Sequence, residues 1–226
     1  MDYIIPSDCQ ISEINRLYKQ IFGYKTNGIF FEIGGFDGEC ASLTCFLADL
    51  GWKGFYIEPV SEYAFHCLRR HRHNDVEVIN VAVGPSGQTI ANISIAEALS
   101  SMAPQHIEAF KKQTWGKNMH QGNIRTVQVV TPNFLLSHWK LKKIDLMVID
   151  TEGYEWPIIS SMDFNKWRPT ALIVELRDQS PSFGKQIQEE SMNVIKKLRD
   201  NNYIIFWRDN CNVIFVDQLY RKELIK

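Results

Sequence analysis

Three carboxylates cluster in the segment VIDTEGYEW, residues 148–156: Asp150, Glu152 and Glu155. The apolar run KIDLMVID at 143–150 predicts a strand, so the acids stand at its carboxyl end and just beyond it. A single acid in such a place is commonly a helix cap. Three acids favour a site that meets a cation or removes a proton. For Glu155 we favour the simpler interpretation, in which its charge stabilises the N-terminus of the following helix.

A glycine-rich turn follows an earlier apolar run, in FFEIGGFDGE at residues 30–39. Its pattern is E-x-G-G-x-x-G, formed by Glu32, Gly34, Gly35 and Gly38. A dinucleotide-binding turn would read G-x-G-x-x-G, but Phe36 and Glu39 stand where its second and third glycines belong. The acids Asp37 and Glu39 would also repel a pyrophosphate. The turn therefore favours a ligand that has no phosphate there and that carries an ammonium or a sulfonium.

A further acid, Glu58, ends the next predicted strand, GFYIEP at residues 54–59. An acid in this position can accept hydrogen bonds from ribose hydroxyls, as it does in dinucleotide-binding folds. Together with the glycine turn it predicts a site for S-adenosylmethionine, whose sulfonium suits the acidic surroundings. The predicted cofactor-binding residues are Glu32, Gly34, Gly35, Phe36, Asp37, Gly38, Glu58, Pro59, Asn80, Val81, Ala82 and Asp150. Residues 80–82, at the tip of the third strand, would flank the adenine.

Strands and helices alternate along the chain, which would bring these acids to one edge of a sheet. The predicted strands are 28–34, 54–59, 76–84, 89–96, 125–131, 143–150, 170–176, 202–207 and 211–217. The predicted helices are 11–22, 40–52, 61–71 with Ser61 as N-cap, 104–115, 152–162 and 185–201. The last two strands lie too close in sequence for a parallel crossover, so they form an antiparallel pair. The pattern predicts an α/β fold, a mostly parallel sheet with helices on both faces.

Five segments together resemble the FkbM family of S-adenosylmethionine-dependent methyltransferases: FFEIGGFDGE, GWKGFYIEP, VINVAVG, DLMVIDTEGYEWPII and RPTALIVEL. They occur in the family's order between about residues 28 and 176, and the most specific part is D-x-E-G-x-E at 150–155 together with Arg168-Pro169 and Glu175. The resemblance implies a seven-stranded class I, Rossmann-like fold with one antiparallel strand. It also implies methylation of a hydroxyl, typically on a sugar or a glycosylated natural product.

The sequence departs from the common family pattern in two places and matches it poorly in one region. Gly35 stands where alanine is usual, and Pro132-Asn133 stands where a leucine-aspartate pair is frequent. If that aspartate has a catalytic or structural part in the family, Asn133 cannot supply its charge. Residues 85–131 are expected to form a variable, acceptor-side region.

The candidate catalytic residues are Asp150, Glu152 and Glu175, at the tips of strands that would be neighbours in the sheet. A carboxylate whose pKa is raised by burial could remove the proton of a hydroxyl as a general base. Alternatively, Asp150 and Glu175 could hold Mg²⁺ or Mn²⁺, which would orient two sugar hydroxyls and lower the pKa of the one that attacks. The residues leave both mechanisms open.

Length, composition and charge limit the possible partners, location and domain organisation of the protein. The chain has 226 residues and a formal net charge of -1, which argues against nucleic-acid binding through phosphate neutralisation. Its first residues lack the pattern of a signal peptide, and no apolar run approaches the ~20 residues that span a bilayer, so we expect a cytoplasmic location. A single domain over residues 1–226 is predicted, with an N-terminal helical extension at 1–27.

These observations predict an O-methyltransferase that acts on a sugar hydroxyl of a glycan or of a glycosylated metabolite. Its partners would be the saccharide acceptor and a glycosyltransferase, either separate or fused to it. Two alternatives stay open: a non-sugar small molecule or an amine as the acceptor, or a methyltransferase-like binding module without turnover.

Overall fold

The structure is a computed structural model that describes residues 9–139, 141 and 143–220. The strands are β1 (Ile29–Ile33), β2 (Lys53–Ile57), β3 (Val76–Ile79), β4 (Ala82–Val83), β5 (Ile90–Ser94), β6 (Ile124–Val130), β7 (Leu146–Ile149), β8 (Ala171–Glu175), β9 (Tyr203–Arg208) and β10 (Asn212–Asp217). The helices are α1 (Ile14–Phe22), α2 (Cys45–Asp49), α3 (Ser61–Arg70), α4 (Pro104–Lys112), α5 (Pro132–His138), α6 (Glu155–Ser161) and α7 (Lys185–Asp200), with a 3-10 turn η1 (Pro181–Phe183).

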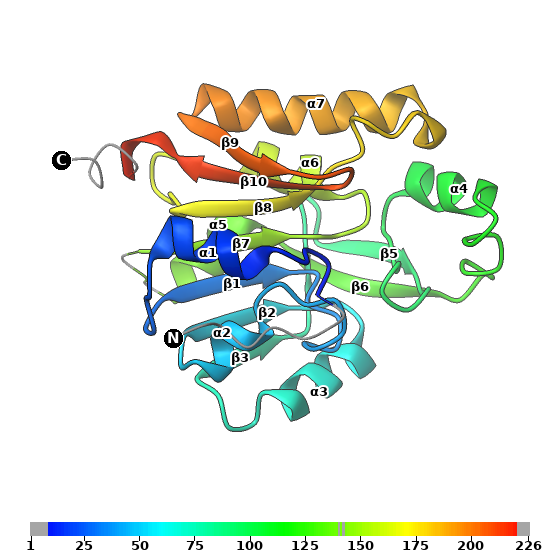
Figure 1. Ribbon diagram of the computed structural model, residues 1–226. Coiled ribbons are helices and arrows are strands. Elements are labelled where there is room, and N and C mark those ends of the chain that lie inside the picture. The colour runs from blue at the N-terminus through cyan, green and yellow to red at the C-terminus, as the bar shows by residue number, and fades with distance from the viewer. Residues whose placement is uncertain (1–8, 140, 142, 221–226) are drawn as a thin grey trace.

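Seven of these strands form one sheet in the order β3-β2-β1-β7-β8-β10-β9 (Figure 1). Strand β10 is antiparallel to both of its neighbours, and the remaining pairs in the sheet are parallel. The α/β fold with a mostly parallel seven-stranded sheet and one antiparallel strand is therefore confirmed. The three remaining strands form a smaller sheet in the order β4-β6-β5.

Successive residues of the central strands face opposite sides of the sheet, which creates two apolar layers. In β1, Phe30 packs with α1, α2 and α3 on one face, and Phe31 packs with α5, α6 and α7 on the other. Both phenylalanines are fully buried. Covering both faces explains why the central strands read as continuous apolar runs rather than as alternating ones.

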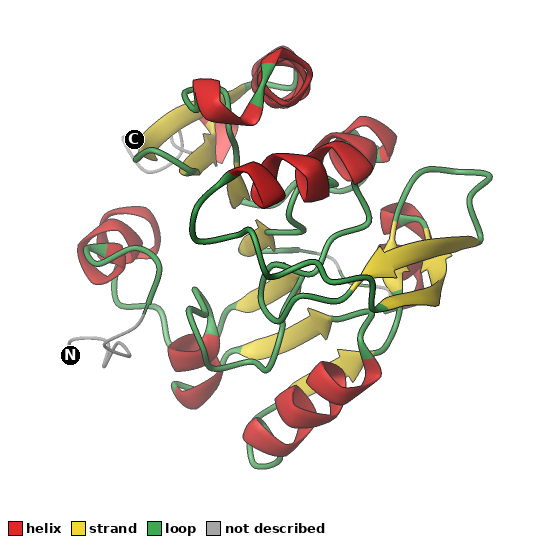
Figure 2. Cartoon of the chain, turned by 90° about the vertical axis from the view of Figure 1, so that its right-hand side faces the viewer, coloured by secondary structure: helices red, strands yellow, loops and turns green. Residues whose placement is uncertain are grey.

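The strand order reverses between β1 and β7, because the chain winds outward in opposite directions from this pair. Ile33 and Ile149, the last residues of the two strands, are paired in register. Ligands of doubly wound sheets bind outside the carboxyl ends of the strands at such a reversal. Figure 2 looks onto this edge of the sheet.

The segment predicted as a variable region lies beyond this edge. Strands β5 and β6 and helix α4 project from the main sheet at the right of Figure 1. Two contacts anchor the segment to the turn after β7: the Ser101 hydroxyl donates to the backbone oxygen of Glu152 at 2.6 Å, and the ring of His106 lies over Gly153. A Cβ added to Gly153 would lie 2.4 Å from that ring, so a larger residue there would push α4 away.

Three predicted boundaries are wrong. The strand predicted at 76–84 is broken after Ile79, where the chain leaves the main sheet and enters β4. The helix predicted at 40–52 is reduced to α2, because the Ser42 hydroxyl accepts hydrogen bonds from the backbone amides of Thr44 and Cys45 and holds a turn instead. Ser61 is the first helical residue of α3 and not its N-cap, since its hydroxyl donates to Glu62.

The structure also bears on the segment before β7, on the N-terminal extension and on membrane-spanning helices. Residues 132–138, which were assigned to no predicted helix or strand, form α5, which begins with the Thr131 side chain as N-cap. Residues 1–8 of the predicted N-terminal extension lie outside the described residues. No helix in the described part of the chain has both the length and the apolar composition that a bilayer crossing requires.

Candidate functional site

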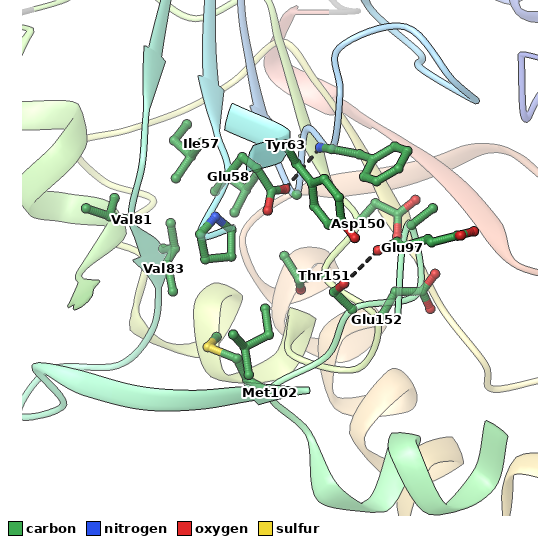
Figure 3. A pocket seen from close by; sticks show the side chains of 18 residues that line it. Ile57, Glu58, Tyr63, Val81, Val83, Glu97, Met102, Asp150, Thr151 and Glu152 are labelled. Carbon is green, nitrogen blue, oxygen red and sulfur yellow. Dashed lines mark hydrogen bonds between the residues drawn. The ribbon is translucent and has the colours of Figure 1, made fainter. Parts of the chain in front are cut away.

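Two pockets open at the carboxyl ends of β1, β2 and β7, and they meet at Asp150. The first, here the Glu58 pocket, has about 520 Å³ of empty space, and the second, the Glu32 pocket, about 560 Å³, in both cases with the open solvent at the mouth included. The residues that line both pockets are Gly34, Phe36, Ala98, Asp150 and Glu152. The predicted acid at the tip of β7 therefore stands at the junction of a two-chambered groove. Figure 3 shows the Glu58 pocket, with Asp150 among the residues that line it.

The glycine turn lets β1 and β7 approach each other at this junction. Gly34 has φ +90°, and a Cβ on it would lie 1.7 Å from the backbone oxygen of Asp150. A Cβ on Gly35 would lie 2.7 Å from the ring of Tyr56, so the alanine usual in the family would press on this ring. Phe36 follows with φ 45°, a left-handed conformation that costs a non-glycine residue free energy and that concentrates at functional sites.

Glu58 faces the first pocket with both carboxylate oxygens already held by the backbone. One accepts the amide of Phe36 at 3.0 Å, and the other accepts the amide of Val60 at 2.8 Å. Burial raises the pKa of Glu58 to about 7, although these two donors act in the opposite direction. Each oxygen of an ionised carboxylate can accept a further hydrogen bond, so a ligand hydroxyl can still be bound. The neighbouring Pro59, Val81 and Ala82 line the same pocket.

Part of the wall of the Glu58 pocket could not be predicted from the motifs. Tyr63 of α3 packs its ring against Phe36, with centroids 4.6 Å apart. Met102, Thr151 and Ile93 complete an apolar lining that would suit a flat ring. Tyr63 stands on a surface helix and Met102 in the variable region, so no sequence pattern distinguished them from other residues.

Glu32 lines the second pocket and is tied to the segment that follows the glycine turn. Its carboxylate accepts hydrogen bonds from the hydroxyls of Ser42 and Thr44, and Thr44 also contacts the hydroxyl of Tyr56 at 2.8 Å. Burial raises the pKa of Glu32 to about 8, and the charge of Asp150 adds to the shift. Ionisation of Glu32 is therefore unfavourable in the empty pocket, and a cation bound there would favour it.

Three predicted cofactor residues line neither pocket. The Asp37 carboxylate accepts hydrogen bonds from the backbone amides of Glu39 and Cys40 and so shapes the turn. Gly38 leaves room for the ring of His71 and the thiol of Cys67, which pack behind the turn. The amide of Asn80 donates to the backbone oxygens of Glu58 and Pro59, which fixes the end of β2 rather than facing the groove.

The acids after β7 form one cluster with the acid at the end of β8. Asp150, Glu152 and Glu175 each offer an oxygen, and these three atoms lie within 4.8 Å of one another. Asp150 is half-buried, whereas Glu152 and Glu175 are each 7% exposed. The nearby cation Arg177 pairs with Glu175, and its Nη2 lies 3.8 Å from Glu152 Oε2. One cation thus faces three acids in the interior.

This imbalance raises the affinity of the cluster for protons. Burial raises the pKa of Glu152 and of Glu175 far above the ordinary value, and the charges of the neighbouring acids add to the shift. Arg177 opposes it. Oε2 of Glu152 and Oε2 of Glu175 have no hydrogen-bond partner among the described residues. The two inner acids are therefore expected to hold a proton, while Asp150 faces the groove.

Asp150 has a partner that sequence reasoning did not foresee. The side-chain amide of Gln10, from the segment before α1, donates to Asp150 Oδ2 at 2.9 Å and lines the Glu32 pocket. Burial raises the pKa of Asp150, and the amide of Gln10 and then the charge of Arg177 lower it. The two residues are 140 positions apart. No local motif can signal such a contact.

Glu155 has a structural role, although it acts on the turn before α6 and the favourable charge at the helix N-terminus stays a prediction. Its carboxylate accepts hydrogen bonds from the backbone of Thr151 and Gly153 and from the Thr151 hydroxyl, at 2.9–3.2 Å. It therefore holds the acidic turn in shape at the start of α6. Asn133 also serves structure, because its amide donates to Ser161 and accepts from Asp163.

The family described as Methyltransferase FkbM domain matches residues 32–205. An O-methyltransferase from Bacillus cereus, in complex with SAH, has a TM-score of 0.50 at 11% identity, over 94% of this chain and 84% of that chain. This likeness supports the fold. No curated protein matched the chain.

Two further solved structures have lower scores. A precorrin-6y C5,15-methyltransferase from Geobacter metallireducens has a TM-score of 0.46 at 10% identity, over 94% of this chain and 91% of that chain. Fibrillarin from Aeropyrum pernix, with natively bound S-adenosyl-L-methionine, has a TM-score of 0.45 at 12% identity, over 88% of this chain and 72% of that chain. Because the family match includes the glycine turn, Glu58 and the whole acid cluster, the chain belongs to the FkbM family of S-adenosylmethionine-dependent methyltransferases.

Proposed function

We propose that the chain transfers the methyl group of S-adenosylmethionine to a hydroxyl of a saccharide, in a glycan or a glycosylated metabolite. The observation that carries this proposal is the position of Asp150, half-buried at the junction of two pockets. A hydroxyl is a weak acid, so its methylation is aided by a group that accepts its proton. The alternative acceptor is a non-sugar small molecule or an amine.

The nucleoside of the cofactor would occupy the Glu58 pocket, with its ribose hydroxyls donating to the carboxylate of Glu58. The adenine would lie among Pro59, Val81 and Ala82, which line that pocket. Its methionine part would extend past Asp150 into the Glu32 pocket. This orientation puts the sulfonium, a fixed positive charge, beside the acids at the junction, where low dielectric strengthens the attraction.

The proposed reaction is a single displacement. The acceptor oxygen attacks the methyl carbon, an oxygen–carbon bond forms, and the carbon–sulfur bond breaks with its electron pair left on sulfur. The proton of the hydroxyl passes to Asp150. Behind Asp150, Glu152 and Glu175 would share a proton, because burial raises the pKa of both. Asp150 would then be the ionised carboxylate that accepts the proton of the hydroxyl.

A divalent metal could be held at the same place, and the donor set is suitable for one. Three carboxylate oxygens within 4.8 Å of one another match the preference of Mg²⁺ and Mn²⁺ for oxygen ligands. Asp150 and Glu175 would hold the ion, with Glu152 beside them. The metal would lower the pKa of a bound hydroxyl and orient it. Against it, Arg177 already neutralises part of the cluster.

A saccharide suits the proposal because it offers hydroxyls to carboxylates and apolar ring faces to aromatic side chains. The junction of the two pockets provides both, because the carboxylate of Asp150 and the ring of Phe36 line it. The family resemblance points to the same class of acceptor. A glycosyltransferase partner would supply the sugar, and it stays a prediction.

The test is a screen of glycans and small hydroxylated or amino compounds with methyl-labelled cofactor. We expect label in one or more saccharides, located on oxygen by mass spectrometry. Asp150→Asn should lower the transfer rate at least ~100-fold and leave SAH affinity within about threefold. The matched control Asp200→Asn removes an exposed pair with Lys196 and should change neither. Wild-type turnover in Asp150→Asn, or label on amines alone, would contradict the proposal.

The metal is tested separately by dialysis against EDTA. If a metal is required, turnover is lost and returns with Mg²⁺ or Mn²⁺, and isothermal calorimetry detects Mn²⁺ binding that Glu175→Gln abolishes. Turnover that survives chelation leaves proton removal by Asp150 as the mechanism.

A further inference from the structure

We infer that the groove selects its acceptor by charge: the acceptor beside Asp150 is neutral or carries an ammonium, and acceptors with a carboxylate or phosphate next to the methylated hydroxyl are rejected. This inference rests on the proposed function and narrows its substrate class to neutral sugars and amino sugars.

The first observation is the composition of the groove walls. Among the described residues, the lining of the two pockets contains five carboxylates and no lysine, arginine or histidine. These are Glu32, Glu58, Glu97, Asp150 and Glu152. An anionic group placed among them would be repelled by those that are ionised, would find no compensating cation in the lining, and would disfavour ionisation of the rest; like-charge contacts of this kind discriminate between ligands.

The second observation concerns Arg177, the cation that acts on the acid cluster. Its side chain is 17% exposed and lines neither pocket, and it is paired with Glu175 and close to Glu152. An anionic acceptor could recruit it only by separating it from these acids. Two buried carboxylates would then lose their cation, which is unfavourable.

The third observation concerns the hydrogen-bonding groups of the lining. Glu152 lines both pockets and is 7% exposed, and its Oε2 has no hydrogen-bond partner among the described residues, although Arg177 Nη2 lies 3.8 Å away. Carboxylate oxygens accept hydrogen bonds, so this lining favours a ligand that brings donors. Hydroxyls and ammonium groups bring donors, whereas carboxylates and ionised phosphates bring only acceptors.

Glu97 is the residue whose substitution best tests the proposed charge selection among acceptors. It lies in the variable region, is exposed, lines the Glu58 pocket and has φ 53°. Neither the proposed proton transfer nor the proposed ribose contact uses its carboxylate. Because Glu97 lines the pocket proposed for the nucleoside, its effect is read from the ratio of kcat/KM values for two acceptors in one variant, in which a change in cofactor binding cancels.

The first arm of the test needs no acceptor. Sinefungin carries an ammonium where the cofactor carries its methylated sulfonium, whereas SAH has an uncharged sulfur there. We expect sinefungin to bind at least ~10-fold more tightly than SAH at low ionic strength by calorimetry, with the ratio shrinking as salt is added. Equal affinities would overturn the inference, because the acids would then not favour positive charge at the junction.

The second arm uses the best saccharide from the labelled-cofactor screen and analogues in which the hydroxyl beside the methylated one is replaced. We expect kcat/KM for the ammonium analogue to equal or exceed that of the parent, and kcat/KM for the carboxylate analogue to be at least ~10-fold lower. Glu97→Gln should narrow the gap and Glu97→Lys should narrow it further. The control Glu108→Gln, on α4 outside both pockets, should not change it.

The two proposals fail separately. A carboxylate analogue used as well as the parent, in the wild type, overturns the charge selection while leaving saccharide methylation intact. A screen without any labelled saccharide overturns the proposed function, whereas the sinefungin comparison still tests the charge of the groove.

Discussion

Glu58 shows how a single residue can couple cofactor binding to pH. Burial raises its pKa to about 7, so near neutral pH a part of the free protein carries a neutral carboxyl at this position. Ribose hydroxyls donate best to the ionised form. Cofactor binding should therefore draw a proton from Glu58, and the affinity should depend on pH around this value.

We predict that SAH affinity falls as pH is lowered through about 7, by up to roughly tenfold per pH unit once the carboxyl is mainly protonated. Calorimetry between pH 5.5 and 8.5 measures this slope. Glu58→Gln, which cannot ionise, should bind more weakly at pH 8 and show a flatter profile. The same slope in wild type and variant would place the titrating group elsewhere.

At the scale of elements, the turn after β1 works because it has no side chain at Gly34. A Cβ there would meet the backbone of Asp150, and its φ of +90° is costly for other residues. Gly34→Ala should therefore separate β1 from β7, lower the unfolding midpoint and abolish SAH binding. Gly87→Ala is the matched control, because Gly87 has φ +89° but open space around it. Similar losses in both variants would mean that strain alone, not the contact with β7, matters.

The segment before α1 contributes to the site although the family match begins only at residue 32. If Gln10 orients the carboxylate of Asp150, Gln10→Ala should lower kcat about 5- to 20-fold, the loss expected for ~1–2 kcal/mol of hydrogen bonding to a charged group. SAH affinity should stay within threefold. Gln20→Ala on α1, whose side chain accepts a hydrogen bond from Arg16, should have no effect. An unchanged kcat in Gln10→Ala would limit this contact to structure.

The elements differ in how far sequence could predict them. The tips of β1, β2 and β7 were predictable, because apolar runs ending in glycine or an acid mark strands buried on both faces. The break after Ile79 was not, since residues 76–84 are apolar throughout and only the second sheet draws the chain away. For the same reason Asn80 was read as a ligand contact, whereas its amide closes the backbone of β2.

In the site, residues whose role follows from their position at a strand end were predictable, whereas residues that act through tertiary contacts were not. Glu58 and Asp150 follow from their places at strand ends. Arg177 and Gln10 gain their roles only when β8 and the N-terminal segment meet β7. Tyr63 and Met102 likewise become a wall only after α3 and the variable region fold over the groove.

For the whole molecule, the buried acids make stability depend on pH in an unusual direction. Burial raises the pKa of Glu32 to about 8 and that of Glu58 to about 7, above the value of 4.5 expected for an unfolded chain. Between about pH 4.5 and 8 the folded state thus holds protons that the unfolded state has released. Stability contributed by these groups is present below pH 4.5 and is lost as pH rises.

We predict that the free protein has a higher unfolding midpoint at pH 6 than at pH 8, by differential scanning calorimetry. Glu32→Gln keeps an oxygen that accepts from Ser42 and Thr44 but removes the titration, so it should raise the midpoint at pH 8 and change it little at pH 5. A variant less stable than wild type at pH 8 would show that the ionised carboxylate is favoured there.

The most direct test of the central claim is a crystal structure of the protein with SAH bound. The account predicts the ribose hydroxyls within hydrogen-bond distance of the Glu58 carboxylate and the sulfur at the junction of the two pockets, beside Asp150. A cofactor bound elsewhere, or a sulfur whose path to Asp150 is closed by protein, would contradict it.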